Sequence, residues 1–250
     1  MREAIRSAAA AVSFLTTVPV GRSAAFADRE RLRDGTVLFP VVGAAVGAAT
    51  GAVAWAAAFV LPPLPAAVLG VGAGALLTGA LHLDGLADTA DGVGASLTGA
   101  DPSTAMHDPR LGVFGGVVLI LDVVLRISVL AALVTGPRFP FEAIAAGALG
   151  RAAAIALLAT TPYAGGAGGT GAWTRDVGVG RCLAAVGVAT GIGIFAVGPL
   201  FGAMVIGGAA VAGLIRRWSR RSLSGMTGDT LGATAELSET MALVAALAIA

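Results

Sequence analysis

Apolar residues run along most of this chain in blocks that are separated by short polar segments. An α-helix needs about 20 mostly apolar residues to cross the roughly 30 Å hydrocarbon core of a bilayer. Several blocks are short, and Gly198-Pro199 is either a tight hairpin or a kink, so we expect six or seven spans. The chain is therefore predicted to be an all-α, polytopic integral membrane helical bundle forming one domain, 1–250. The seven blocks are roughly 37–60, 65–81, 113–134, 142–161, 182–198, 200–215 and 230–250.

Composition supports the membrane prediction. Of the 250 residues, 56% are hydrophobic and only 12% are charged, whereas soluble domains carry about 25% charged residues. The 37 glycines favour close packing between helices in lipid. The single cysteine excludes an internal disulfide.

The first twenty residues are predicted to form an amphipathic helix at the membrane interface. Arg2 and Arg6 precede an alanine-rich run, as in a signal peptide. That run is short, and Ser13 and Thr16 interrupt it, so an interfacial helix fits better. The residues expected on one face are Ile5, Ala9, Val12 and Leu15 or Thr16.

The arginines predict how the spans are oriented. If all seven blocks span, one side of the membrane holds thirteen arginines and the other holds only Arg138, with Arg126 and Arg151 inside spans. Positive loops stay in the cytoplasm, so the N-terminus and the polar loops are predicted to be cytoplasmic. The thirteen are Arg2, Arg6, Arg22, Arg29, Arg31, Arg33, Arg110, Arg175, Arg181, Arg216, Arg217, Arg220 and Arg221.

The segment 82–92 is rich in aspartate and follows an apolar block directly. Asp84, Asp88 and Asp91 are spaced i, i+4 and i+7, which places them within a stripe of roughly 60° on one helix face. Because three carboxylates repel each other, a hard divalent cation such as Mg²⁺ or Mn²⁺ is the expected partner, and Mg²⁺ usually also binds substrate phosphates. The alternative is a solvated acidic loop, against which the apolar residues between the carboxylates argue.

A second polar motif, 106–115, precedes the next apolar block. Asp108 is a candidate to complete the metal shell, and Arg110 is a candidate to bind phosphate oxygens in a bidentate manner. The alternative is a salt-bridged loop ahead of a helix. His82 and His107 are too few for a zinc site, so each either orients a carboxylate, acts as an acid or base, or is an ordinary interfacial histidine.

Acidic residues also lie at the start of the last apolar block. Asp229 and Glu236 share a helix face, and Glu239 lies about 60° round from Glu236. Because an acidic group inside a span costs about 2.5–3.5 kcal/mol, we expect these glutamates to face a polar cavity, where they ligate a second metal or bind substrate hydroxyls. Within the spans, Asp122 and Arg126 are predicted to pair with each other, and Arg151 is predicted to face the bundle interior.

Through these residues and their neighbours, the sequence resembles the cobalamin synthase family, the adenosylcobinamide-GDP ribazoletransferases. One departure is at His107 and Pro109, where the family more often has arginine and serine. The matching stretches run in order through nearly the whole chain: Phe14 to Pro19, Phe39 to Gly43, His82 to Gly92, Asp108 to Gly115, Gly150-Arg151, Thr161 to Tyr163, and Thr227 to Ala233 with Glu236 and Glu239.

The resemblance implies a Mg²⁺-dependent transferase of the bacterial cytoplasmic membrane, with its active site on the cytoplasmic side. A ribose hydroxyl of α-ribazole or of its 5′-phosphate would attack adenosylcobinamide-GDP, releasing GMP and forming adenosylcobalamin or its 5′-phosphate. The expected partners are these small molecules and the lipid bilayer, without nucleic acid, and a homo-oligomer is left open. The catalytic candidates are Asp84, Asp88, Asp91, Asp108, Glu236 and Glu239, of which the first four are the metal candidates, and Asp108, Glu236 or Glu239 is the candidate base. The substrate-binding candidates are His82, Arg110, Arg151, Asp229 and Thr230.

Two other classes compete with this interpretation. The first class is another membrane transferase with an aspartate-rich Mg²⁺ site. A CDP-alcohol phosphotransferase needs Ala-Arg where this chain has Ala87-Asp88. A prenyltransferase needs a second aspartate-rich motif, which Asp229 with Glu236 matches poorly. An ion-coupled transporter is the other. Its acids should lie near mid-membrane on broken helices, whereas the acids here are expected at one face of the membrane.

Overall fold

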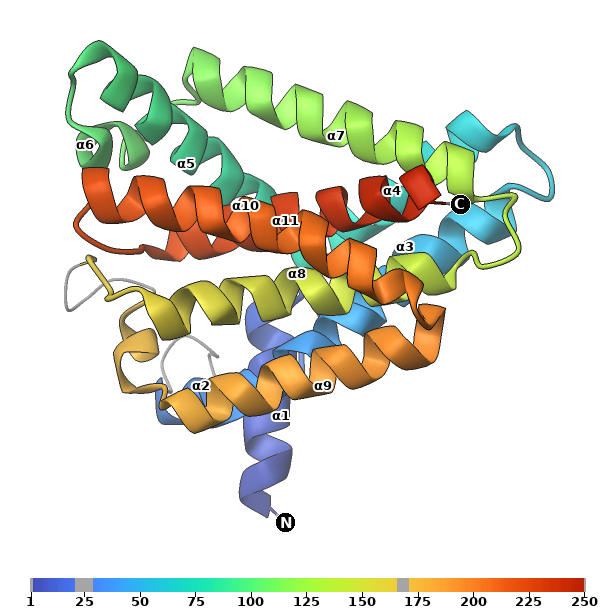
Figure 1. Cartoon of the computed structure of the whole chain (residues 1–250), viewed down its shortest axis with the longest axis horizontal. Coiled ribbons are helices and arrows are strands. Elements are labelled where there is room, and N and C mark those ends of the chain that lie inside the picture. Colours follow the sequence, from blue (N-terminus) through green and yellow to red (C-terminus); the bar gives the residue numbers. More distant parts are fainter. Residues whose placement is uncertain (1, 21–28, 166–170, 250) are drawn as a thin grey trace.

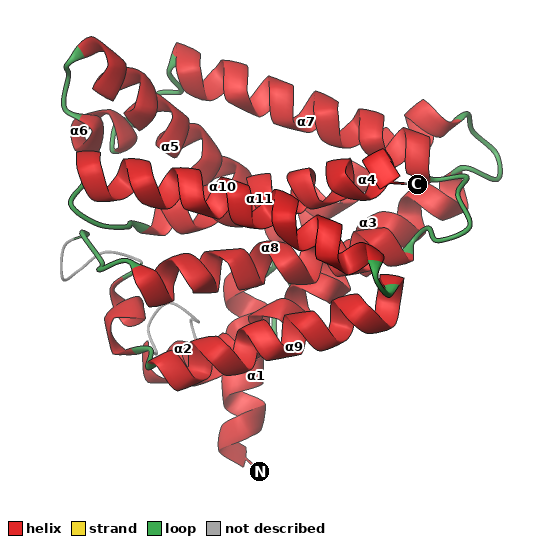
Figure 2. Cartoon of the chain, in the orientation of Figure 1, coloured by secondary structure: helices red, strands yellow, loops and turns green. Residues whose placement is uncertain are grey.

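The computed structural model describes residues 2–20, 29–165 and 171–249, and within these ranges all regular elements are helices (Figures 1 and 2). Arg22 and most of the glycine-rich loop after Tyr163 lie outside the described residues. The helices are α1 Arg2–Leu15, α2 Arg29–Gly35, the 3₁₀ turn η2 Thr36–Leu38, α3 Phe39–Ala57, α4 Pro63–Thr78, α5 Leu81–Thr98, α6 Pro102–Met106, α7 Val113–Leu133, α8 Phe141–Thr160, the 3₁₀ turn η3 Ala172–Asp176, α9 Val179–Val197, α10 Leu200–Ser222 and α11 Gly228–Ile249.

The predicted all-α polytopic bundle is confirmed. Six helices are long and apolar enough to cross a membrane, and α4 with α5 forms a bent pair that raises the number to seven if it counts as one span. The boundaries agree with the predicted blocks to within a few residues, except that α10 continues seven residues beyond 215, through its arginines. Helices α8 and α11 are mostly buried, whereas only 22% of the most apolar stretch of α7 and of α9 is buried.

The loops gather at the two ends of the bundle (Figure 1). At one end lie α6 and the segments that follow α8 and α10, and at the other lie the C-terminus and the short connections before α4, α8 and α10. The first end carries most of the loop arginines, and we call it the arginine-rich end. A parallel bridge between Tyr163 and Met226 ties the segment after α8 to the one before α11 there.

Small residues let the central helices touch backbone to backbone. A Cβ added at Gly43 of α3 would overlap the carbonyl oxygen of Gly147 in α8, and one at Gly47 would overlap that of Ala143. Lipid offers little hydrophobic drive between helices, so such close approach stabilises the bundle through van der Waals contact. The abundance of glycine noted in the sequence therefore has a packing role.

The polypeptide turns by 90° between α4 and α5. Gly79 and Ala80 both adopt left-handed backbone conformations, with φ of 60° and 58°, which stops one helix and redirects the next. Thr17 completes the turn. Its backbone N–H donates to the carbonyl of Leu77 at 2.8 Å, and its hydroxyl donates to the carbonyl of Leu76 at 3.3 Å. The block predicted at 65–81 is therefore not a straight span by itself but the first helix of a sharply bent pair.

Helix α1 forms as predicted, but its buried face differs from the predicted one. Ser7, Ala10, Ala11 and Leu15 are buried, whereas Ile5 is 62% exposed. The prediction assigned the apolar stripe to the membrane, but Leu15 of that stripe and the small residues beside it are buried against the protein. Ile5 stays uncovered by the described residues, which suits contact with a bilayer surface.

Candidate functional site

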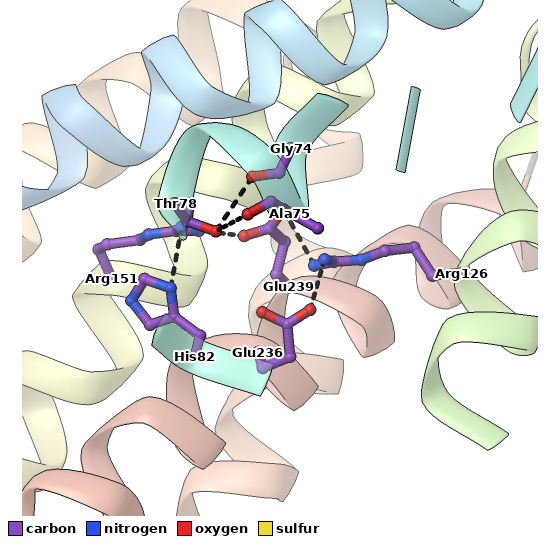
Figure 3. Close-up of polar contacts among 8 residues, drawn as sticks. All are labelled: Gly74, Ala75, Thr78, His82, Arg126, Arg151, Glu236 and Glu239. Atoms are coloured by element: carbon purple, nitrogen blue, oxygen red, sulfur yellow. Dashed lines mark hydrogen bonds and ion pairs between the residues drawn. The ribbon is translucent and has the colours of Figure 1, made fainter. Parts of the chain in front are cut away.

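A buried ionic network joins four helices at the centre of the bundle (Figure 3). Arg126 of α7 contacts Glu236 at 2.5 Å and Glu239 at 3.0 Å, both on α11. Arg151 of α8 pairs with Glu239 and lies 3.5 Å from the Nδ1 atom of His82 on α5. The side chains of both arginines and both glutamates are at most 13% exposed.

This network explains how two glutamates are tolerated inside a span. The two arginines balance the charge of Glu236 and Glu239, so an isolated charge is not left in the low-dielectric interior. Arg151 faces the bundle interior, as predicted. The predicted pair between Asp122 and Arg126 is wrong, because Arg126 reaches across to α11 and no ion pair to Asp122 forms among the described residues. The expectation that the acids lie only at one face of the membrane is also wrong.

A second group of acids lies between α5 and α11. Asp84, Asp88 and Asp229 act on one another as like charges, and Asp91 and His107 also act on Asp88. Asp84 is exposed, whereas Asp88 and Asp229 are half-buried. None of these three carboxylates has an ion-pair partner within the described part of the chain. We call Asp84, Asp88 and Asp229 the carboxylate cluster.

Close contact between the two helices brings the carboxylate cluster together. A Cβ added at Gly85 would lie 2.8 Å from the carbonyl oxygen of Asp229 and 3.3 Å from the Cα of Gly232. Only glycine at position 85 lets the backbones of α5 and α11 approach this closely without a shift. The glycine between Asp84 and Asp88 therefore fixes where Asp229 lies relative to them.

Asp91 has a different role from the other aspartates of its stripe. One of its carboxylate oxygens accepts the backbone N–H of Gly112 and the other accepts that of Gly115, both at 2.8 Å. A carboxylate here pairs with the free amides and the positive end of the dipole of α7. Asp91 thus anchors the start of α7, and the predicted stripe divides into two cluster acids and one helix cap.

Asp108 and Arg110 form the salt-bridged loop that the sequence left open as an alternative. Arg110 donates to both carboxylate oxygens of Asp108, at 3.0 and 2.8 Å, and its side chain is 87% exposed. The guanidinium of Arg110 lowers the pKa of the Asp108 carboxyl to about 2. Asp108 therefore stays ionised and paired at any pH well above 2, and neither residue joins the carboxylate cluster.

Thr230 and His82 are placed by structural contacts. The Thr230 hydroxyl donates to the carbonyl of Thr227 at 3.0 Å and accepts the Thr227 backbone N–H at 2.8 Å, which caps the start of α11. Thr230 is fully buried and His82 is 5% exposed. Both predicted substrate contacts thus support the site from within the protein, although His82 also borders a cavity.

That cavity lies beside the carboxylate cluster and has a volume of about 290 Å³. Its polar border consists of Asp84 and His82 from α5, Arg151 from α8 and Asp229 from α11. Three aromatic residues, Phe14, Phe39 and Trp173, also line it, and none of them was a candidate from the sequence. The sequence did hold a signal for two of them, because Phe14 and Phe39 each begin one of the short N-terminal stretches that carry the family resemblance.

The predicted metal shell of Asp84, Asp88, Asp91 and Asp108 does not assemble. Across the described residues, no three His, Cys, Asp or Glu side chains converge tightly enough to hold a metal ion, because Asp91 caps α7 and Asp108 pairs with Arg110. The carboxylate cluster nevertheless fits a hard divalent cation in its donors, since it offers only oxygen ligands and its charges are uncompensated.

Replacing Gly85 with alanine is expected to lower activity by about 100-fold, because displacing catalytic groups by about 1 Å costs that much. The added Cβ would force Asp229 away from Asp84 and Asp88. Turnover of purified protein measures the effect. Gly191→Ala in α9 is the matched control, since a Cβ there meets nothing within 4 Å. Equal activity of the two variants would contradict the role of the α5–α11 contact.

Replacing Asp108 with asparagine is expected to change turnover by no more than a few-fold. Its carboxylate is paired in an exposed loop, where ion pairs contribute little. The same assay measures this effect. If turnover fell as much as it does when an aspartate of the carboxylate cluster is replaced by asparagine, Asp108 would belong to the metal shell.

These features define the class of the protein. It is an all-α, multi-pass membrane protein in which a carboxylate cluster and a cavity adjoin a charge-balanced core. The chain belongs to the cobalamin-5-phosphate synthase family, whose model matches residues 7–247. It is therefore an enzyme of cobalamin biosynthesis, a transferase.

Several known proteins of similar sequence are named adenosylcobinamide-GDP ribazoletransferase. One from Klebsiella pneumoniae (strain 342) is 38% identical over 97% of this chain and 100% of its own length. Another from Pseudomonas aeruginosa (strain PAO1) is 39% identical over 98% of this chain and 99% of its length. One from Leptothrix cholodnii is 36% identical over 95% and 93%, respectively. No solved structure matches the chain.

Proposed function

We propose that this protein transfers the cobinamide phosphate of adenosylcobinamide-GDP to a ribose hydroxyl of α-ribazole or its 5′-phosphate, at the carboxylate cluster. The full-length relatives are named for this reaction. The observation that carries the proposal is the cluster itself, in which three carboxylates without an ion-pair partner among the described residues lie together and two of them, Asp84 and Asp229, border a ligand-sized cavity. Such a concentration of negative charge is costly unless it serves to bind a cation.

In this reaction the ribose hydroxyl oxygen forms a bond to the phosphorus that bears the cobinamide. The bond between that phosphorus and the GMP oxygen breaks, GMP leaves, and the hydroxyl proton passes to a base. One or two aspartates of the carboxylate cluster, with the substrate diphosphate completing the ligands, would hold Mg²⁺, which would neutralise the charge of the diphosphate and stabilise the leaving GMP. Asp84 and Asp229 border the cavity as well as the cluster, which suits them to orient the attacking hydroxyl.

The other candidate bases are less suitable. Glu236 and Glu239 are each paired with an arginine in the core, so their oxygens are engaged away from the carboxylate cluster. Asp108 is paired outside the cluster. Proton acceptance by Asp84 or Asp229 therefore agrees best with the geometry.

We further propose that the site opens to the cytoplasm across the bacterial inner membrane. Asp229 is the second residue of α11, close to the arginine-rich end. Positively charged loops are retained in the cytoplasm. Both substrates are large, charged or polar molecules, so access from the aqueous cytoplasmic side avoids transport across lipid.

An assay on purified protein in lipid bilayers tests the reaction type. We expect adenosylcobinamide-GDP and α-ribazole to yield GMP and a cobalamin, identified by mass spectrometry, only when both substrates and Mg²⁺ are present. A CDP-alcohol or a prenyl diphosphate supplied as donor should give no product. Product from one of these donors, and none from adenosylcobinamide-GDP, would favour the competing transferase classes.

A further inference from the structure

Three aromatic rings from separate parts of the chain meet in one wall of the cavity. Phe14 of α1 and Phe39 of α3 are stacked, with centroids 5.8 Å apart and planes at 20°. Trp173 of η3 meets both rings edge-on, at 5.6 Å in each case. All three residues line the cavity of about 290 Å³ that reaches the carboxylate cluster. Contacts between aromatic rings hold such a wall rigid.

Trp173 carries a buried donor without an acceptor. The residue is 4% exposed, and its indole Nε1 atom has no hydrogen-bond partner among the described residues. Leaving a buried N–H unpaired is costly, so such groups usually have a partner. The atom is covered in the structure, so an acceptor on a ligand in the cavity that Trp173 lines would reach it after a small rotation of the indole ring.

The remaining wall is largely apolar. Leu15, Leu81, Ile155, Leu158 and Leu231 complete it around the rings. The polar groups on its border are already committed within the protein or to the cluster: Arg151 pairs with Glu239 and lies against His82, and Asp84 and Asp229 belong to the cluster. The cavity therefore suits a flat, apolar ring system with few polar atoms.

Of the groups in the proposed substrates, only one has this chemistry. The corrin macrocycle is too large, since the cavity lies at the lower end of the size range for small-molecule pockets. Guanine has donors and acceptors along its edges that an apolar wall would leave unpaired. The benzimidazole base of α-ribazole is an apolar bicyclic ring, and beyond its glycosidic nitrogen it carries a single imine nitrogen, which is an acceptor.

The geometry points to this cavity as the subsite for the benzimidazole base of ribazole, with the base against Phe14, Phe39 and Trp173 and its imine nitrogen accepting the Trp173 indole N–H. This assignment rests on the proposed function and extends it to the acceptor substrate. With the base in the cavity, the attached ribose lies toward Asp84 and Asp229, which border the same space. Its hydroxyl is then next to the carboxylate cluster, where the diphosphate is proposed to bind.

Equilibrium binding tests the subsite without turnover. Purified protein in lipid nanodiscs is titrated with α-ribazole and with its analogue in which the imine nitrogen is replaced by C–H, in the absence of adenosylcobinamide-GDP. We expect the wild type to bind α-ribazole about tenfold more tightly than the analogue, because one buried hydrogen bond is lost. In Trp173→Phe, which keeps a ring but lacks the N–H, the ratio should fall to about one.

Two further variants make the test specific. Phe14→Leu should weaken the binding of both ligands by about tenfold and leave their ratio unchanged, because base–aromatic stacking does not depend on the imine nitrogen. Trp55→Phe is the matched control, since Trp55 lies on the exposed side of α3 against Phe59. It should bind both ligands as the wild type does.

Failure of the subsite differs from failure of the function. If the wild type binds α-ribazole and its C–H analogue equally tightly, or if Trp173→Phe keeps the tenfold difference between them, the subsite is overturned even if GMP is released normally. A higher KM for adenosylcobinamide-GDP in Trp173→Phe, with unchanged ribazole binding, also overturns it, because guanine would then occupy the cavity. The expected ratios in a wild-type protein that releases no GMP would support the subsite and contradict the proposed reaction.

Discussion

Replacing Asp88 with asparagine is expected to lower turnover by at least 10²–10³-fold, the usual cost of removing one group that stabilises developing charge. Asp88 is the acid of the cluster on which Asp84 and Asp229 both act. Its loss weakens cation binding and leaves the diphosphate charge unbalanced. GMP release at saturating substrate, measured over a range of Mg²⁺ concentrations, should show lower turnover and a higher Mg²⁺ requirement.

Asp101→Asn is the matched control for this substitution. Asp101 lies outside the cluster and caps α6 by accepting the Thr104 backbone N–H at 2.8 Å. Asparagine caps helices as well as aspartate does, so this variant should keep wild-type turnover. If Asp88→Asn were as active as Asp101→Asn, the carboxylate cluster would not be the catalytic centre.

Replacing Glu239 with glutamine is expected to destabilise the protein by about 3–5 kcal/mol, the usual cost of breaking a buried ion pair by removing one partner. Glu239 contacts both Arg126 and Arg151. Without its charge, Arg151 loses its one ion pair among the described residues, and Arg126 keeps only that with Glu236. Denaturant unfolding in mild detergent, followed by circular dichroism, measures the change.

Glu142→Gln provides the comparison within the same bundle. Glu142 of α8 is 3% exposed and has no ion-pair partner among the described residues, so removing its charge should not destabilise the fold. If both variants unfolded at the same denaturant concentration, the core network would not be a source of stability.

The spans were predictable because their signal is local. A block of apolar residues of spanning length implies a helix whatever packs against it, and six or seven helices formed close to the predicted boundaries. The 90° turn at Gly79 and Ala80 was not predictable in this way. It depends on a left-handed alanine and on Thr17, which is distant in the sequence.

The candidate site was predicted residue by residue but not as an arrangement. Helical spacing identified the face shared by Asp84, Asp88 and Asp91, but it could not show that Asp91 would turn toward α7 and that Asp229 would replace it in the cluster. Both outcomes depend on contacts between helices, such as that of Gly85 with Asp229. The same holds for the glutamates of α11, whose arginine partners come from two other helices.

The most direct test compares purified wild-type protein in lipid bilayers with variants carrying Asp→Asn at position 84, 88 or 229. With adenosylcobinamide-GDP, α-ribazole and Mg²⁺, the wild type should form GMP and cobalamin in equal amounts. Each variant should form both products at least about 100-fold more slowly. GMP release by the wild type without any cobalamin, or undiminished cobalamin formation by all three variants, would contradict transfer at the carboxylate cluster.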